Sequence, residues 1–272
     1  TLGPVLGGFL LFSTNSFTTI YLTVGFLGLL AFLLATTLPL QENTAPVVAA
    51  RPDRWKQFRS GVLEVVDNRA VLIASGAEAC LFLGVGALVG FLPLYAKGKG
   101  LSDAHVGLIL GAQVVTAMLG KPLTGRLSDR IGRKPMILLG LTLCAGVLPI
   151  VALVGSFGML FALGTLFGLG MAIVTPSTTA LVADLCQSGR YGAAMGVFGS
   201  ILDIGEASGP ILAGFLIASL GYFPTFALIA ALMAAVTFIF ASLVRDPQPP
   251  NERRKCESDE EKEPPHLKGV SA

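Results

Sequence analysis

The feature that most constrains this sequence is a series of apolar runs, each about as long as a membrane-spanning helix. Six follow one another at 70–96, 103–123, 134–154, 157–186, 190–219 and 223–244. A bilayer core about 30 Å thick takes about 20 helical residues to cross. Backbone groups in lipid have to be hydrogen-bonded within the segment, so such runs form helices. The sequence therefore predicts an all-α polytopic membrane protein.

Two further apolar stretches lie at the N-terminal end, where no charged residue precedes Glu42. A polar cluster at 13–19 separates a short apolar piece from a run at 20–39, which is long enough to span. The chain starts inside an apolar stretch without Met, so we expect it to be part of a longer protein. We therefore expect eight spans, the first of them incomplete.

Composition supports a membrane protein and argues against other classes. The chain is 53% hydrophobic and 13% charged, with a mean hydropathy of +0.74, whereas soluble domains carry about 25% charged residues. A net charge of +2 gives no reason to expect a nucleic-acid partner. The four cysteines are widely spaced, which favours neither a disulfide framework nor a metal site. We expect no cofactor.

Basic residues are concentrated on alternate connections. Seventeen of the 19 Lys and Arg residues lie in the segment 41–69, around 121–134, at Arg190 or from Arg245 to the C-terminus. The intervening connections hold only Lys97 and Lys99. Because cytoplasmic loops carry the excess of Lys and Arg, we expect the basic segments and the C-terminus to be cytoplasmic. The plasma (inner) membrane is the expected location.

The polar segments divide the chain into four predicted parts. Residues 1–40 end an N-terminal helical half, and 70–245 form a C-terminal six-helix half. Between them, 41–69 is a cytoplasmic linker whose apolar residues recur at helical spacing, which indicates a possible amphipathic helix on the membrane surface. The Pro-rich, charged segment 246–272 is expected to be a disordered tail.

A Gly-Pro motif occurs twice, 206 residues apart. Its glycines and prolines are Gly3, Pro4, Gly7 and Gly8 in the first copy and Gly209, Pro210 and Gly214 in the second. Each copy is followed by one more apolar run and a charged segment, as expected for two similar halves. Proline bends a helix, and glycines four residues apart allow helices to pack closely in lipid.

The connection at 125–134 reads Gly-Arg-Leu-Ser-Asp-Arg-Ile-Gly-Arg-Lys. It resembles, without a mismatch, the signature loop of the major facilitator superfamily. The matching residues are Gly125, Leu127, Asp129, Arg130, Gly132, Arg133 and Lys134. The Gly-Pro motif is similar to one in the drug:proton antiporters of that family. The resemblance implies a partial major facilitator fold, helices 5–12 of 12.

The residue types of this connection suggest a gating role. Gly125 and Gly132 would let the loop turn tightly. Asp129 suits a helix N-terminus or an Arg partner, and the basic residues can bind carboxylates or lipid phosphates. Such a charged latch would stabilise one access state. The alternative is that these are positive-inside residues without any gating role.

Few polar residues are predicted to lie deep in the membrane. Glu78, Gln113, Asp203 and Glu206 are candidates for proton coupling or substrate binding, because intramembrane charges are costly and tend to serve function. A packing network that involves another helix is the alternative for Asp203 and Glu206. Asp184 lies near Arg190, and we interpret it as part of an ion pair at the cytoplasmic edge.

The resemblance implies a secondary transporter rather than an enzyme. We expect proton-coupled efflux of small drug-like or amphipathic compounds by alternating access, with protons, substrate and membrane lipids as partners and a monomeric full-length protein. An uptake symporter or facilitator for a metabolite is the closest alternative. A truncated chain without independent transport is a second alternative. A membrane enzyme is less favoured, because no H-E-x-x-H or G-x-S-x-G motif is present.

Overall fold

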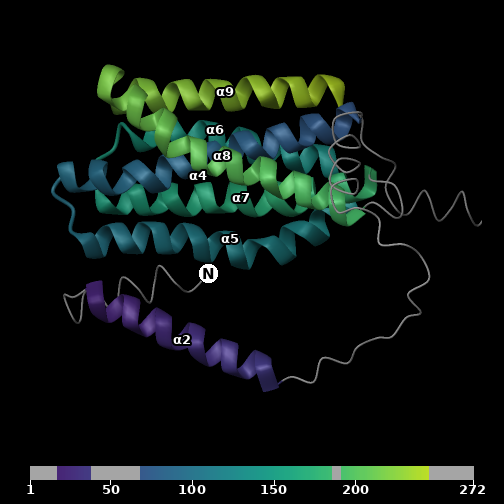
Figure 1. The fold of residues 1–272 in the computed structure, drawn as a ribbon. Helices are drawn as coiled ribbons and strands as arrows, with labels where there is room; N and C mark the ends of the chain where they lie inside the picture. Colours follow the sequence, from purple (N-terminus) through teal and green to yellow (C-terminus); the bar gives the residue numbers. More distant parts are fainter. Residues whose placement is uncertain (1–16, 38–67, 186–190, 245–272) are drawn as a thin grey trace, which may run out of the picture.

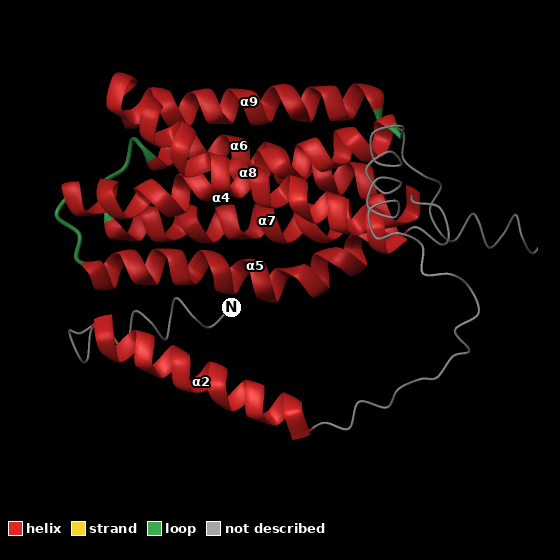
Figure 2. Cartoon of the chain, in the orientation of Figure 1, coloured by secondary structure: helices red, strands yellow, loops and turns green. Residues whose placement is uncertain are grey.

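The computed structural model describes residues 17–37, 68–185 and 191–244, and all regular structure in these ranges is helical (Figure 2). The helices are α2 (Phe17–Thr37), α4 (Arg69–Gly98), α5 (Asp103–Ile131), α6 (Arg133–Val151), α7 (Phe157–Leu185), α8 (Tyr191–Leu220) and α9 (Tyr222–Leu243). The six helices α4 to α9 are long and apolar enough to cross a membrane. The chain is therefore a multi-pass integral membrane protein, which confirms the predicted fold class.

Several predicted segments lie outside the described residues. They are the incomplete first span with the first Gly-Pro motif, the amphipathic helix of the linker, and the C-terminal tail. The run at 20–39 corresponds to α2, whose apolar part, Tyr21–Thr37, is shorter than the six spans.

The six helices α4 to α9 lie side by side, whereas α2 lies apart from them (Figure 1). Helix α4 packs extensively against α8, and α7 packs in the same way against α5. Helices α4–α6 therefore pack mainly against α7–α9 rather than against one another.

Local sequence signals set the starts of the first two bundle helices. The Asn68 side chain accepts hydrogen bonds from the backbone N–H groups of Ala70 and Val71, at 3.1 and 3.4 Å, where α4 begins. Ser102 and His105 form a reciprocal cap at the start of α5. Both caps satisfy backbone donors that have no partner within the helix.

The predicted end of the apolar run 103–123 is wrong. Helix α5 continues to Ile131, eight residues beyond the expected end at 123. Gly125 lies inside this helix, so it makes no turn. The chain turns at Gly132 alone, with φ at 112°, a conformation that residues with a side chain rarely adopt. The signature loop is therefore mostly the last two turns of α5.

Glycines bring α4 and α8 into backbone contact. A Cβ atom at Gly205 or Gly209 would collide with the carbonyl oxygen of Ala79 or Leu83 on α4. In return, Gly86 leaves room for the Glu206 carbonyl of α8. This packing confirms the role predicted for glycines four residues apart on these two helices.

The second Gly-Pro motif belongs to the same interface. A Cβ atom at Gly86 would lie 2.9 Å from Cδ of Pro210, and one at Gly90 would lie 3.3 Å from its Cβ. Gly214 faces Phe91 of α4, where an added Cβ atom would lie 3.1 Å from the ring. The motif therefore places α8 against α4 along about one and a half helical turns.

Candidate functional site

Glu78 is the most unusual polar residue of the bundle. It lies on α4 with 0% of its surface exposed, and neither carboxylate oxygen has a hydrogen-bond partner. An unpaired charge in a low-dielectric interior is costly, and buried charges are normally paired. A carboxyl group in this setting has to hold a proton or acquire a positively charged partner.

Polar groups from two other helices face Glu78. The hydroxyl groups of Thr178 and Thr175 on α7 lie close to its carboxyl group. Cys144 of α6 is near enough for an electrostatic interaction with it. The Thr178 hydroxyl donates to the Val174 carbonyl at 2.9 Å, and the Thr175 hydroxyl has no partner. Neither threonine therefore donates a hydrogen bond to Glu78, and both carboxylate oxygens remain without a partner.

Lys121 of α5 is a basic residue at a depth similar to that of Glu78. It lies ten residues before the end of α5, and Glu78 lies nine residues from the start of α4 at the same end of the bundle. At 1.5 Å per residue, both are about 14 Å from that end. We call it the Gly132 end, because the chain turns there at Gly132.

The sequence pattern places Lys121 where the predicted run 103–123 and the basic connection around 121–134 overlap. In the structure it lies inside α5, ten residues before the end of that helix. The apolar run before Lys121 and the Pro122 after it resemble a helix end. Thr175 and Thr178 are missed, since hydroxyl residues in apolar runs are common and carry no distinctive signal.

Gln113 lies two turns farther along α5, on the same face as Lys121. It is 2% exposed, its amide nitrogen contacts the Met171 sulfur at 3.6 Å, and its amide oxygen has no partner. Its backbone is held against Gly168 of α7, where a Cβ atom would collide. Gln113 and Glu78 are thus both buried, and each has a side-chain oxygen without a hydrogen-bond partner.

Asp203 and Glu206 lie elsewhere. Both side chains are exposed on α8, and neither takes part in an ion pair between described residues. They are three positions apart and so share one side of the helix. The structure does not bring them together with Glu78, which faces α7 rather than α8. Their predicted role in coupling stays a prediction.

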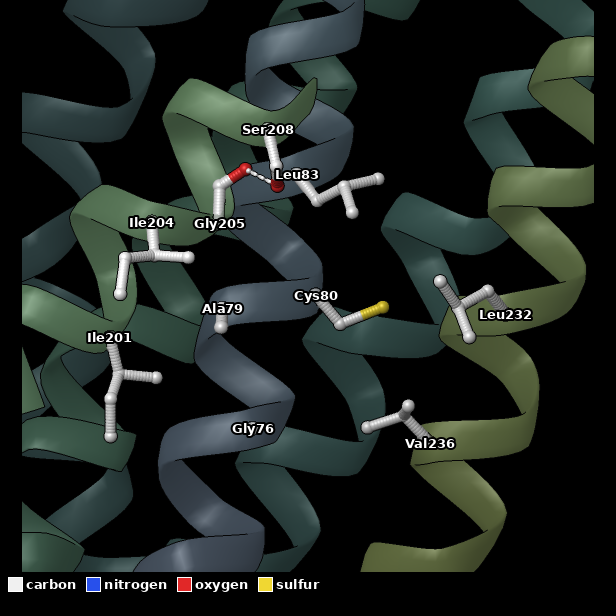
Figure 3. A pocket seen from close by; sticks show the side chains of 10 residues that line it. All are labelled: Gly76, Ala79, Cys80, Leu83, Ile201, Ile204, Gly205, Ser208, Leu232 and Val236. Carbon is white, nitrogen blue, oxygen red and sulfur yellow. Dashed lines mark hydrogen bonds between the residues drawn. The ribbon is translucent and has the colours of Figure 1, made fainter. Parts of the chain in front are cut away.

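An apolar crevice of about 360 Å³ lies between α4, α8 and α9 (Figure 3). Gly76, Ala79, Cys80 and Leu83 line it from α4, and Ile201, Ile204, Gly205 and Ser208 line it from α8; Leu232 and Val236 complete it from α9. Glu78 is on the opposite face of α4, because residues 76, 79, 80 and 83 share one face. The crevice and the buried carboxyl group are therefore separate features.

The Gly132 end carries a network of charges. Arg133 is bonded to Asp129 at 2.5 Å and to Asp184 of α7 at 3.4 Å, and only 15% of its side chain is exposed. Asp184 thus belongs to an ion pair at the edge of the bundle, with Arg133 as its partner; Arg190 lies outside the described residues. Asp129 is in the last turn of α5, so the N-terminal position considered for it is wrong.

The remaining signature residues surround this network. Leu127 and Arg130 are exposed on α5, and Lys134 follows Arg133 in the first turn of α6. Ser128 is buried at 1% exposure and its hydroxyl has no hydrogen-bond partner. The motif therefore joins the ends of α5, α6 and α7, the three helices that carry Lys121, Cys144 and the Glu78-facing threonines.

A bundle of six membrane-spanning helices in which α4–α6 pack against α7–α9 has the helix number and composition of one half of a secondary transporter. The chain belongs to the major facilitator superfamily, whose family model matches residues 74–269. It is therefore a member of a family of transporters rather than of enzymes.

The similar proteins of known name include two bacterial resistance proteins. Quinolone resistance protein NorA of Staphylococcus aureus is 29% identical over 181 residues, which are 66% of this chain and 46% of that protein. Multidrug resistance protein 2 of Bacillus subtilis (strain 168) is 34% identical over 163 residues, 58% of this chain and 40% of that protein. The chain matches less than half the length of these relatives.

Proposed function

We propose that the complete gene product is a proton-coupled exporter of small, drug-like or amphipathic compounds that works by alternating access. The observation that carries this proposal is Glu78, fully buried and without a hydrogen-bond partner inside a membrane-spanning bundle. The names of the two resistance proteins support the substrate class. The positive-inside distribution supports an orientation with the Gly132 end in the cytoplasm of the cell that expresses it.

Glu78 has the properties that a proton carrier needs. Its carboxyl group is neutral when it holds a proton and costly to leave charged and unpaired. A cationic group of a substrate could replace the proton, so that one occupant leaves when the other binds. This exclusion couples the export of substrate to the entry of protons, which is the condition for antiport.

Two other sets of residues are proposed to support the cycle. Asp203 and Glu206 occupy an open face of α8, where they would meet a substrate or a proton in a cavity. The network of Asp129, Arg133 and Asp184 would hold the ends of α5, α6 and α7 together in one access state and release them in the other.

The test is transport into inverted membrane vesicles by the complete gene product. A proton gains roughly 2.3 kcal/mol per 100 mV crossed, enough to sustain about 50-fold accumulation of a fluorescent substrate. We expect Glu78→Gln to abolish accumulation driven by a pH gradient and to keep substrate exchange between equal pools. Exchange needs no net proton movement, so it separates coupling from binding.

Asp203→Asn and Glu206→Gln are the matched comparisons, because both also remove an acidic group from a membrane-spanning helix. Full gradient-driven accumulation by Glu78→Gln would refute the role of Glu78 and direct attention to this pair. Accumulation in right-side-out vesicles but not in inverted ones would refute export and favour an uptake symporter instead.

A further inference from the structure

The apolar crevice between α4, α8 and α9 has no role in the scheme above (Figure 3). Helices α8 and α9 each pack against α4 but only sparsely against each other, so a gap remains on that side of α4. Its volume of about 360 Å³ lies in the range of small-ligand sites. Helix interfaces rarely leave voids larger than a water molecule, so a space of this size calls for an occupant from outside the bundle.

The crevice is open to the outside of the described bundle, and its lining is apolar. On its rim, Ile204 is 68% exposed and Leu232 is 47% exposed. Among the described lining residues, the one hydroxyl group is that of Ser208, which donates to the Gly205 carbonyl of its own helix at 2.9 Å (Figure 3). An occupant therefore gains van der Waals contact with hydrocarbon rather than hydrogen bonds.

The depth of the crevice corresponds to the hydrocarbon layer of the membrane. Gly76 and Leu83 follow the start of α4 at Arg69 by seven and 14 residues, which places them about 10 and 21 Å from the Gly132 end. The hydrocarbon of one leaflet is about 15 Å deep. A lipid with its headgroup at the start of α4 can therefore extend an acyl chain into the crevice.

Arg69 lies where the headgroup of such a lipid would be. It is the first residue of α4, it is exposed, and it forms none of the ion pairs between described residues. Arg69 shares one face of α4 with the crevice residues Gly76, Cys80 and Leu83, because intervals of seven, four and three keep to one side of a helix. Helical side chains lean toward the N-terminus, which inclines Arg69 toward the membrane surface. A guanidinium group there can bind a phosphate with two hydrogen bonds.

We propose that the crevice is a binding site for an anionic phospholipid in the leaflet at the Gly132 end, with one acyl chain between α8 and α9 and the headgroup at Arg69. The acyl chain fills the space that the sparse contact of α8 and α9 leaves open, and the negative headgroup complements the guanidinium charge. Basic residues at the ends of membrane helices attract anionic lipids in this way. The site requires insertion into a membrane but not proton-coupled export.

The test is photo-crosslinking of the purified complete gene product in vesicles with equal amounts of phosphatidylglycerol and phosphatidylcholine. In paired samples, one of the two lipids carries a diazirine in the middle of an acyl chain, and crosslinked peptides are identified by mass spectrometry. We expect phosphatidylglycerol to label the peptides that contain Cys80 and Ile204 in preference to phosphatidylcholine. Arg69→Gln should lower this preference by about fivefold, as for one basic residue near an anionic lipid.

Gly76→Leu tests the crevice itself. A Cβ atom at Gly76 meets nothing within 4 Å, so the leucine side chain fills the crevice without displacing a helix and should reduce labelling by both lipids. Gly146→Leu is the matched control, because a Cβ atom there also meets nothing within 4 Å but Gly146 lies on α6, which does not line the crevice. Arg126→Gln is the control for charge, since Arg126 is exposed on α5 toward the same end of the bundle. Both controls should keep the wild-type labelling.

Equal labelling of the crevice peptides by the two lipids, or a preference that Arg69→Gln leaves intact, would overturn the proposal. Full labelling in Gly76→Leu would also overturn it, because the acyl chain would then lie elsewhere. An absence of crosslinks to these peptides in the wild-type protein would refute the lipid site and indicate that another part of the gene product covers the crevice. None of these outcomes depends on export, which is measured separately.

Discussion

Asp129 and Glu78 carry the same functional group in opposite surroundings. The Asp129 side chain is 55% exposed and bonded to Arg133, whereas Glu78 is fully buried and unsatisfied. An exposed ion pair contributes about 0–1 kcal/mol to stability, whereas an unpaired buried charge costs more than this. At the residue scale, we therefore expect Asp129 to affect the access state and Glu78 to affect coupling.

The Asp129→Asn variant tests the proposed latch. We expect it to change the free energy of unfolding by less than about 1 kcal/mol and to slow transport by up to about fivefold, the rate equivalent of such a contact. Initial rates in vesicles, normalised to protein abundance, provide the measurement. Arg126→Gln is the control, because Arg126 lies on the same helix end and joins none of the ion pairs between described residues. Equal slowing in both variants would favour a role in orientation alone.

At the scale of helices, the interface of α4 and α8 is set by backbone contact rather than by interlocking large side chains. Gly205 contacts the carbonyl of Ala79, and Gly86 contacts that of Glu206. In lipid, close approach of helices through small residues replaces the hydrophobic effect as the source of packing energy. A side chain added on this face has to separate the two helices along their length.

Gly205→Ala should therefore destabilise the bundle, by about 1–3 kcal/mol as for other overpacked sites. Gly196→Ala is a matched control on the same helix, because a Cβ atom there meets nothing within 4 Å. Thermal unfolding in detergent can be followed with a thiol-reactive fluorophore, since Cys80 and Cys144 are buried in the folded bundle. An unfolding midpoint temperature for Gly205→Ala as high as that for Gly196→Ala would contradict this expectation. It would show that the added methyl group at the α4–α8 interface does not destabilise the bundle.

At the scale of the whole molecule, the charge network and the Glu78 site lie toward one end of the bundle. At the other end, Tyr95 of α4 contacts the connection that follows α6. Its hydroxyl donates to the carbonyls of Ala152 and Val154, each at 2.9 Å. If the Gly132 end is cytoplasmic, as the distribution of Lys and Arg predicts, the carboxyl group lies closer to the side from which an exporter collects its substrate.

Labelling of single cysteines tests this orientation in a background without the native cysteines. A membrane-impermeant maleimide added to intact cells should label Ser156→Cys, which is exposed in the connection between α6 and α7. Ile131→Cys, at a position that is 56% exposed at the Gly132 end, should react only after permeabilisation. The reverse pattern would contradict the predicted topology.

The sequence by itself determined the number, order and approximate bounds of the six bundle helices. Lipid leaves no alternative to internal backbone hydrogen bonds, so a run such as 223–244 predicts α9 to within a residue or two. The motif at 125–134 likewise indicated the family before the fold was known. The end of α5 was missed because residues 124–131 are polar enough to resemble a loop, yet they are helical and pack through Thr124 and Ser128, which are buried.

Only the tertiary structure decided which helix faces meet. The bundle helices are apolar all round, so their patterns give little indication of an inner face. Packing brings Glu78 from α4 next to Thr178 from α7, and it leaves Asp203 and Glu206 exposed on α8. These residues are remote in sequence, and their proximity follows from glycine-mediated contacts between helices, which a single helix cannot reveal because each contact depends on the backbone of its partner.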